Sequence, residues 1–184
     1  MSKDALLLTG ASGGVGTSLC RHLRDDFHLI PVVRDRAKLE DRVGPLDDMT
    51  PLVSELAEPS DVDGMLDRLV AEFEEVPYVI NNAGVNIQSP IRRLEPAEIA
   101  RSLQVNAVTP VRIMKTVLPR MDEQGFGRII NVTSGAPFNC VAGYGAYSAS
   151  KAALNAFTVT AANEHADDDI RINLMSPGPV RSGM

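Results

Sequence analysis

The stretch Leu6–Gly16, "LLLTGASGGVG", joins a short apolar run to four glycines and decides how the chain is expected to fold. The leucines predict a buried strand, and the following "TSLCRHL" predicts a helix. Gly10 can supply a tight turn, while Gly14 and Gly16 allow backbone to approach a pyrophosphate and a neighbouring strand. The stretch therefore predicts a strand–turn–helix unit whose turn binds phosphate. A turn that only shapes the backbone is the alternative.

The rest of the chain repeats this alternation of short apolar runs and longer amphipathic segments. Strands separated by helices of about ten or more residues predict parallel βαβ units with right-handed crossovers. The expected fold is a single α/β domain, residues 1–184, with a Rossmann-type doubly wound parallel sheet flanked by helices. Strands are expected at 5–8, 28–33, 52–55, 78–80, 128–132 and 171–174, and helices near 14–24, 62–74, 96–121 and 147–164.

Composition narrows the class of partner. The net charge of −6 argues against nucleic acid or an anionic membrane as the main partner. The apolar run near the N-terminus is too short for a signal peptide, and no run approaches the roughly 20 residues of a membrane span. Cys20 and Cys140 lack the spacing of a metal site or a disulfide framework, so we expect a reducing, cytoplasmic location and no metal.

The segments that follow the strands have a shared character. They read "TGASGGVG", "RDRAK", "NNAGVN", "TSGAPF" and "SPGPVRS", and they are rich in Gly, Asn, Ser and Pro. Ligands of doubly wound sheets bind beyond the carboxyl ends of the strands. We therefore expect these segments to gather along one edge of the sheet and to form the site there.

No Walker lysine follows the glycines of the first segment, which argues against hydrolysis of a nucleoside triphosphate. The second segment, "RDRAK", bears on the choice of dinucleotide. Arg34 comes first after the second strand, where an arginine can accommodate the 2′-phosphate of NADP(H) and an acidic residue would favour NAD(H). Ser12 could add a hydroxyl donor to the same phosphate. NADP(H) is therefore favoured over NAD(H), although a solvated charge cluster at a helix start is the alternative for Arg36 and Lys38.

A second motif, "GYGAYSASKAAL" at 143–154, carries groups for proton transfer. Tyr147 and Lys151 are one helical turn apart. A free phenol has a pKa near 10, and a cation within about 4–6 Å favours phenolate. Ser134, at the end of the fifth strand, can hold a substrate oxygen beside such a phenol. Tyr147 is therefore the expected proton donor or acceptor, with helix packing as its alternative role, while Tyr144 precedes the regular helix and at most lines the pocket.

In these motifs the chain resembles the short-chain dehydrogenase/reductase family, in its classical branch. Five pieces match in order over essentially the whole chain. The family pattern TGxxxGxG matches 9–16, NNAG matches 81–84, the helix asparagine matches Asn106, the serine and YxxxK match Ser134 and 147–151, and PGxVxT matches 177–182.

The resemblance implies roles for these residues. Lys151 would also bind the ribose hydroxyls of the nicotinamide half, and Asn106 would hold a water in a proton relay, although Asn106 could instead bond a neighbouring carbonyl. Asn81 and Asn82 would brace the sheet. The catalytic set is then Asn106, Ser134, Tyr147 and Lys151. The expected cofactor contacts are Gly10, Ser12, Gly13, Gly14, Val15, Gly16, Arg34, Glu55, Leu56, Asn82, Ala83, Gly84, Tyr147, Lys151, Pro177, Gly178, Val180 and Ser182.

Three departures from the family pattern stand out. Glu55 replaces an aspartate beside the adenine, and Ser182 replaces a threonine that contacts the nicotinamide amide but keeps its hydroxyl. The chain also ends where the family would begin its substrate-covering loop, another helix and a last strand. We therefore expect a fold that lacks this C-terminal region, and a homo-oligomer, dimer or tetramer, if the native C-terminus is complete.

The expected activity is interconversion of a carbonyl compound and its secondary alcohol by direct hydride transfer with NADP(H). The pocket-facing candidates Ile87, Pro137, Phe138, Val141 and Tyr144 indicate an apolar or partly aromatic substrate. A non-catalytic dinucleotide-binding scaffold or redox sensor is one alternative, because the substrate lobe is missing. Epimerase or dehydratase chemistry is another, although the chain is short for a sugar-nucleotide lobe.

Overall fold

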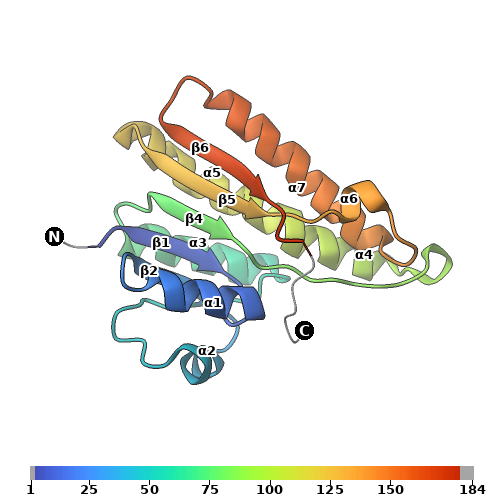
Figure 1. Ribbon diagram of the computed structural model, residues 1–184, viewed down its shortest axis with the longest axis horizontal. Coiled ribbons are helices and arrows are strands. Elements are labelled where there is room, and N and C mark those ends of the chain that lie inside the picture. The colour runs from blue at the N-terminus through green and yellow to red at the C-terminus, as the bar shows by residue number, and fades with distance from the viewer. Residues whose placement is uncertain (1–2, 179–184) are drawn as a thin grey trace.

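Six strands form one sheet in the order β3-β2-β1-β4-β5-β6, and all the recorded pairings are parallel (Figure 1). The computed structural model describes residues 3–178. The strands are β1 (Ala5–Thr9), β2 (His28–Val33), β3 (Leu52–Val53), β4 (Tyr78–Asn81), β5 (Gly127–Val132) and β6 (Ile170–Met175). Strand order reverses between β1 and β4, which creates the topological switch point of a doubly wound fold. The Rossmann-type sheet expected from the sequence is thus confirmed.

Helices connect the strands and cover the sheet. They are α1 (Gly14–Leu23), α2 (Arg36–Val43), α3 (Pro59–Glu72), α4 (Pro96–Leu103), α5 (Thr109–Gln124), α6 (Ala136–Asn139) and α7 (Gly145–Glu164), with a 3-10 turn η1 (Ile91–Arg93) and a π turn η2 (Gln104–Val108). No helix within residues 3–178 combines the length and the apolar character needed to cross a membrane.

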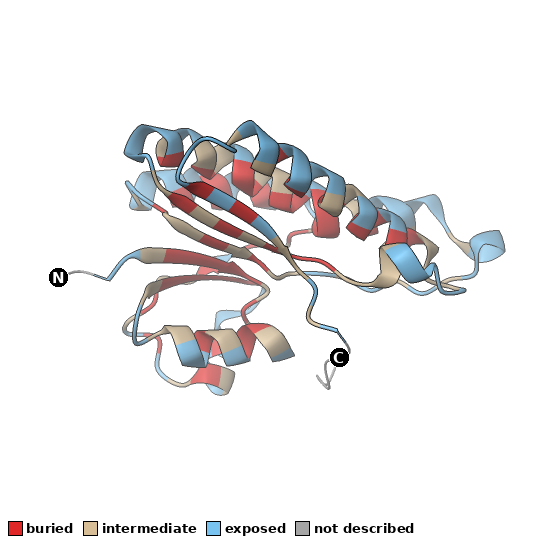
Figure 2. Ribbon diagram, turned by 45° about the horizontal axis from the view of Figure 1, so that its top comes forward, coloured by how far each residue is buried: buried red, intermediate tan, exposed pale blue. Residues whose placement is uncertain are grey.

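Two apolar layers hold the helices on the sheet. Leu6 and Leu8 of β1 point to one face, where they pack with residues of α1 and α2, among them Cys20 and Leu39. Leu7 points to the other face, into a cluster built with α3, α5 and α7. Because both faces of the central strands are covered, residues of β1 and β2 are buried in succession, as Figure 2 shows.

Apart from the four-residue α6 and the three-residue turn η1, which were not expected, two helical segments differ from the sequence expectation. The single helix expected over 96–121 is split into α4, the π turn and α5. Pro110 lies at the start of α5 and has no N–H, so it cannot donate the α-helical bond to the carbonyl of Asn106. The second difference is α2, which the expected helices omitted. It is short, its N-cap Asp35 accepts from the amide of Lys38, and its only buried residues are Leu39 and Val43.

A chain of buried amides and a hydroxyl joins the middle of the sheet to α7. The side-chain nitrogen of Asn81 in β4 donates to Oδ1 of Asn131 in β5 at 2.8 Å. Nδ2 of Asn131 in turn donates to the hydroxyl of Thr158 in α7 at 2.9 Å. None of the three residues is more than 1 % exposed. The network therefore helps to fix α7, which carries Tyr147 and Lys151, relative to β4 and β5.

We predict that Asn131→Leu destabilises the protein by about 2–3 kcal/mol, because it leaves the buried amide of Asn81 without its acceptor. Asn173→Leu is the matched control, since Asn173 lies exposed on the neighbouring strand β6, and it should change the free energy of unfolding by less than about 0.5 kcal/mol. Urea unfolding of both variants measures the difference. Equal losses would mean that the buried network contributes nothing specific.

Candidate active site

The glycine turn after β1 is shaped by contacts that exclude side chains. Gly10 has φ of +67°, and a Cβ on it would lie 2.8 Å from the Cα of Ala83 beyond β4. A Cβ on Gly16 would collide with the carbonyl oxygen of Gly10. The expected tight turn at Gly10 is present. The close approach to the neighbouring strand end, however, is made by Gly10, whereas Gly16 packs against the turn itself.

The start of α1 fits a pyrophosphate. Gly13 is the N-cap and contributes no side-chain hydrogen bond, and the first turn holds no acidic residue. The first amides of a helix lack intrahelical acceptors, and the helix dipole favours an anion beside them. The amides of Gly14, Val15 and Gly16 are thus placed where backbone donors and a cradle free of side chains can receive phosphate oxygens.

Asn82 ties the glycine turn to the end of β4. Its side-chain nitrogen donates to the carbonyl of Thr9 at 3.1 Å and to that of Gly10 at 3.3 Å. The hydroxyl of Thr9 in turn accepts from the backbone amides of Asn82 and Ala83, each at 3.0 Å. These bonds close the switch point between β1 and β4, which brings 9–16 and 81–84 together as the sequence analysis expected.

The region beyond β2 presents two arginines. Arg34 is exposed and lies 3.6 Å from the carboxylate of Glu55, which follows β3. Arg42, in α2, donates from Nη1 to the backbone carbonyl of Ser12 at 2.6 Å. The sequence analysis missed Arg42 because it considered a helix start at Arg36 only as an alternative and did not give that helix bounds. The apolar pair Leu39 and Val43, four residues apart, was the available signal.

An open groove lies beside Glu55, the residue that the sequence analysis placed next to the adenine. It holds about 590 Å³ between the residues after β3 and α4, and Glu55, Ala57 and Gln104 are among its lining residues. The side chain of Leu56 is instead buried in the core, and its carbonyl accepts a hydrogen bond from the hydroxyl of Thr109 at 3.1 Å. Any cofactor contact of Leu56 must therefore come from its backbone.

The residues from which the sequence analysis expected proton transfer follow the end of β5. Lys151 in α7 is only 3 % exposed, and its ammonium donates to the carbonyl of Val132 at 2.7 Å. Ser134 lies two residues further along, and its hydroxyl accepts from the amide of Ala136 at 3.1 Å. Tyr147 is half-buried one turn before Lys151. Burial lowers the pKa of Lys151 to about 8, so the amine is a cation at neutral pH.

Asn106 occupies the centre of a second buried network. Its Oδ1 accepts from the amide of Val85 at 2.8 Å, while Nδ2 donates to the carbonyl of Val85 and to the hydroxyl of Ser150, both at 2.9 Å. Ser150 also donates to the carbonyl of Tyr147 at 2.7 Å. The side chain of Asn106 thus bonds a segment 21 residues away, rather than a carbonyl of its own helix. It holds the loop after β4 beside the start of α7.

Tyr144 has a different environment from Tyr147. It is the residue before the first turn of α7, and its hydroxyl accepts from the side-chain nitrogen of Gln88 at 2.9 Å. The two tyrosine rings lie edge to face, with their centres 6.3 Å apart. Tyr144 thus precedes the helix, as expected from the sequence, and its contact with Gln88 links the loop after β4 to the segment that leads into α7.

The last expected contacts follow β6. Pro177 is half-buried, and Gly178 has φ of +55°, in the left-handed region. Val180 and Ser182 lie outside the described residues. The remaining expected residues are thus found on the turn after β1 and on the segments after β2 to β6, which parallel topology places at one end of the sheet.

Comparison with known proteins decides the family. The family described as "short chain dehydrogenase" matches residues 4–184. This chain belongs to that family. The protein is therefore an NAD(P)-dependent oxidoreductase that acts on CH–OH groups. Members of the family act on small-molecule substrates.

Individual relatives show what kinds of protein share this fold. An acetoacetyl-CoA reductase of Cupriavidus necator is 29% identical over 190 residues, covering 100% of this chain and 77% of the relative. A metagenomic short-chain oxidoreductase solved with NADP is 29% identical, with a TM-score of 0.87 over 98% of this chain and 85% of that one. A 4-hydroxyisoleucine dehydrogenase solved with NADH is 25% identical, with a TM-score of 0.91 over 98% and 75%.

We predict a pH-dependent cost of burying Lys151. Its pKa is lowered from 10.5 to about 8 in the folded protein, so between these values the unfolded chain keeps a proton that the folded chain has lost. Stability must then rise with pH across this window. Relative to Lys151→Met, the free energy of unfolding of the wild type should increase by about 2 kcal/mol from about pH 7 to about pH 10.

The matched control is Lys115→Met, at an exposed position of α5. Urea unfolding of this variant and of the wild type should respond to pH in parallel. A constant difference between the wild type and Lys151→Met over the same range would show that the buried amine does not change its protonation on unfolding.

Proposed function

We propose that this short-chain dehydrogenase interconverts a carbonyl compound and its secondary alcohol with NADP(H), and that Tyr147 exchanges the proton. The observation that carries the proposal is the buried ammonium of Lys151, held at the end of β5 one turn after Tyr147 and beside the segment that carries Ser134. A plain packing role for Tyr147 gives no reason to bury a lysine at this place.

Each side chain has a distinct part in the proposed reaction. The nicotinamide cofactor, when bound, supplies or accepts the hydride at the substrate carbon. Ser134 donates a hydrogen bond to the substrate oxygen and holds it at the hydroxyl of Tyr147. In the direction of reduction, Tyr147 gives its proton to that oxygen, and the positive charge of Lys151 stabilises the phenolate that is left.

The π turn offers a way to resupply the proton. The side chain of Asn106 is engaged with Val85 and Ser150, so it is not the group that would hold a water. Its backbone carbonyl is better suited, because Pro110 cannot donate the helical bond to it. We place the proposed relay water at this carbonyl, from which a proton can pass by way of Lys151 to Tyr147.

The preference for NADP(H) rests on charge beside the glycine turn. We place Arg34 and Arg42 at the proposed 2′-phosphate, and Arg42 is held next to Ser12 by its bond to the carbonyl of that residue. The pairing of Arg34 with Glu55 would have to open for Arg34 to take part. Relatives with NADP and with NADH are both known, so the arginines of this chain carry the proposal.

The substrate proposed is a small carbonyl compound with an apolar or partly aromatic part. Phe138 and Val141 are 82 % and 55 % exposed beside the proposed site, and they offer apolar surface to such a molecule. The cytoplasmic location and the homo-oligomer expected from the sequence stay predictions. Apolar side chains at Ile99 and Val108, exposed on α4 and the π turn, are compatible with an interface between copies.

Replacement of Tyr147 by phenylalanine tests the proton transfer. We expect Tyr147→Phe to lower kcat for reduction of a carbonyl panel by about 10²-fold to 10⁴-fold while NADPH still binds. Tyr144→Phe is the matched control, and it should keep most of the turnover, because it removes only the hydroxyl that accepts from Gln88 and keeps the ring. Equal rates for wild type and Tyr147→Phe would exclude this mechanism, and binding of NADPH without any turnover by the wild type would favour the scaffold.

Replacement of the two arginines tests the cofactor preference. Arg42→Gln and Arg34→Gln should each raise the Kd for NADPH by about tenfold or more and leave that for NADH within about twofold, because only NADPH carries the 2′-phosphate. Arg36→Gln, exposed at the start of the same helix α2, is the control. A parallel loss of both cofactors would instead indicate that the glycine turn had been distorted, and tighter binding of NADH by the wild type would contradict the assignment.

A further inference from the structure

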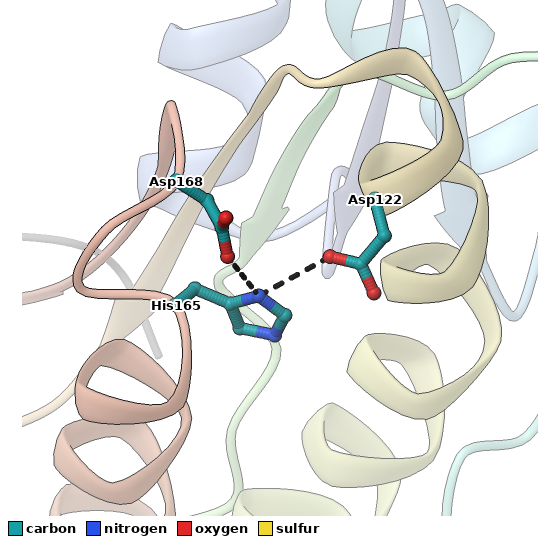
Figure 3. Close-up of side chains that lie close together, drawn as sticks. All are labelled: Asp122, His165 and Asp168. Carbon is teal, nitrogen blue, oxygen red and sulfur yellow. Dashed lines mark hydrogen bonds and ion pairs between the residues drawn. The ribbon is translucent and has the colours of Figure 1, made fainter.

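Three side chains able to bind metal meet at the end of the sheet opposite the glycine turn. Asp122 lies in the last turn of α5, His165 directly follows α7, and Asp168 lies in the turn before β6. Figure 3 shows both carboxylates directed at the same nitrogen of the imidazole. Nδ1 of His165 lies 3.2 Å from Oδ1 of Asp122 and 3.2 Å from Oδ2 of Asp168. The strands β5 and β6 begin here, so the cluster is separate from the proposed active site.

Without a metal, the hydrogen bonding of this cluster is incomplete. An imidazole nitrogen carries at most one hydrogen, so Nδ1 of His165 cannot donate a linear hydrogen bond to each of two carboxylates. One carboxylate must share the hydrogen or go without it. A cation in place of that hydrogen can bind the nitrogen of His165 and an oxygen from both Asp122 and Asp168.

The distances fit a small tetrahedral ion. With metal–nitrogen and metal–oxygen bonds of about 2.0–2.1 Å, neighbouring ligand atoms of a tetrahedron lie about 3.3 Å apart. Two of the three ligand pairs, at 3.2 Å, already have this spacing. All three ligand atoms lie within 4.8 Å of one another, so the third pair, Asp122 and Asp168, can close by side-chain rotation.

The local charge also favours a divalent cation. Two carboxylates balance its charge, and the C-terminal ends of α5 and α7 add partial negative charge. The neighbouring guanidinium groups are directed elsewhere. Arg128 pairs with Asp169 at 2.8 Å, and Arg171 donates to the backbone carbonyl of Asp168 and lies 3.9 Å from Asp169. Neither of these two ion pairs involves the carboxylates of the cluster.

We propose that Asp122, His165 and Asp168 form a zinc site. A set of one imidazole and two carboxylates suits Zn²⁺, whereas Mg²⁺ and Ca²⁺ prefer oxygen ligands alone. The carboxylates are half-exposed, at 49% and 52%, and the imidazole is 13% exposed, so an ion can enter from solvent and a water can complete the four ligands. Bound zinc joins the end of α5 to the end of α7 and to the start of β6. Its role is to stabilise the fold, because it lies far from Tyr147 along the helix α7.

Titration of the full chain with zinc tests this site. Cys140 is exposed and could bind zinc by itself, so all proteins carry Cys140→Ser. After removal of metal by a chelator and dialysis, Zn²⁺ alone is titrated in a calorimeter. We expect one Zn²⁺ per chain with a Kd of about 1 µM or below, and a zinc-dependent rise in the unfolding temperature. Co²⁺ as a second probe should give the visible absorption of a four-coordinate site.

Variants assign the ligands. His165→Ala should abolish the binding, and Asp122→Asn and Asp168→Asn should each weaken it by about tenfold to 100-fold. Asp167→Asn is the matched control, because Asp167 is the exposed carboxylate next to Asp168 but outside the cluster, and it should bind zinc like the parent protein. Circular dichroism in the absence of metal shows that each variant is folded.

Two results would overturn the proposal. One is the absence of zinc binding by the parent protein up to about 1 mM. The other is binding that is equally tight in the parent protein and in folded His165→Ala or Asp122→Asn, since the ligands would then lie elsewhere. In either case the three side chains do not form a zinc site.

Discussion

The ammonium of Lys151 lies almost completely out of water, and its recorded hydrogen bond is to the carbonyl of Val132 at the end of β5. A buried charge is costly unless the surrounding structure holds its partner in place. The packing of α7 against β5 and β6 has to be maintained for this contact to exist. Burial lowers the pKa of Lys151 to about 8, and the charge that remains at neutral pH is the one that the proposed mechanism uses to stabilise a phenolate at Tyr147.

The other buried polar groups serve the same geometry. Asn131 links β4 and β5 to α7 at mid-helix, and Asn106 links the loop after β4 to Ser150, next to Lys151. Gly84 belongs to the same arrangement, because a Cβ there would lie 3.3 Å from Oδ1 of Asn106 and 3.7 Å from Nζ of Lys151. Side chains that look like isolated polar residues in the sequence thus form two buried networks that fix α7, one at its start and one at its middle.

Prediction from the sequence succeeded where a local pattern reflects a local cause. The glycine turn, all six strands and the start of α7 follow from apolar periodicity and from backbone conformations that only glycine adopts readily. It failed where a local signal was outweighed by another contact or was too weak to decide. The apolar pattern over 96–121 is continuous, yet Asn106 bonds Val85 and Pro110 removes a helical donor, so the helix is interrupted. The short α2 and its Arg42 were missed because two apolar residues make a weak periodic signal.

The sequence by itself determined the class of fold and pointed to the residues proposed to react, because spacing along a strand or a helix settles which residues share a face. It could not determine which distant segments meet. The contact of Arg42 with Ser12, the contact of Asn106 with Val85, and the meeting of Asp122 with His165 and Asp168 were decided by the tertiary structure alone. The reason is physical. Parallel strands and right-handed crossovers bring together segments that are distant in the sequence, through the packing of whole helices. No local sequence pattern shows which distant segment a residue will contact.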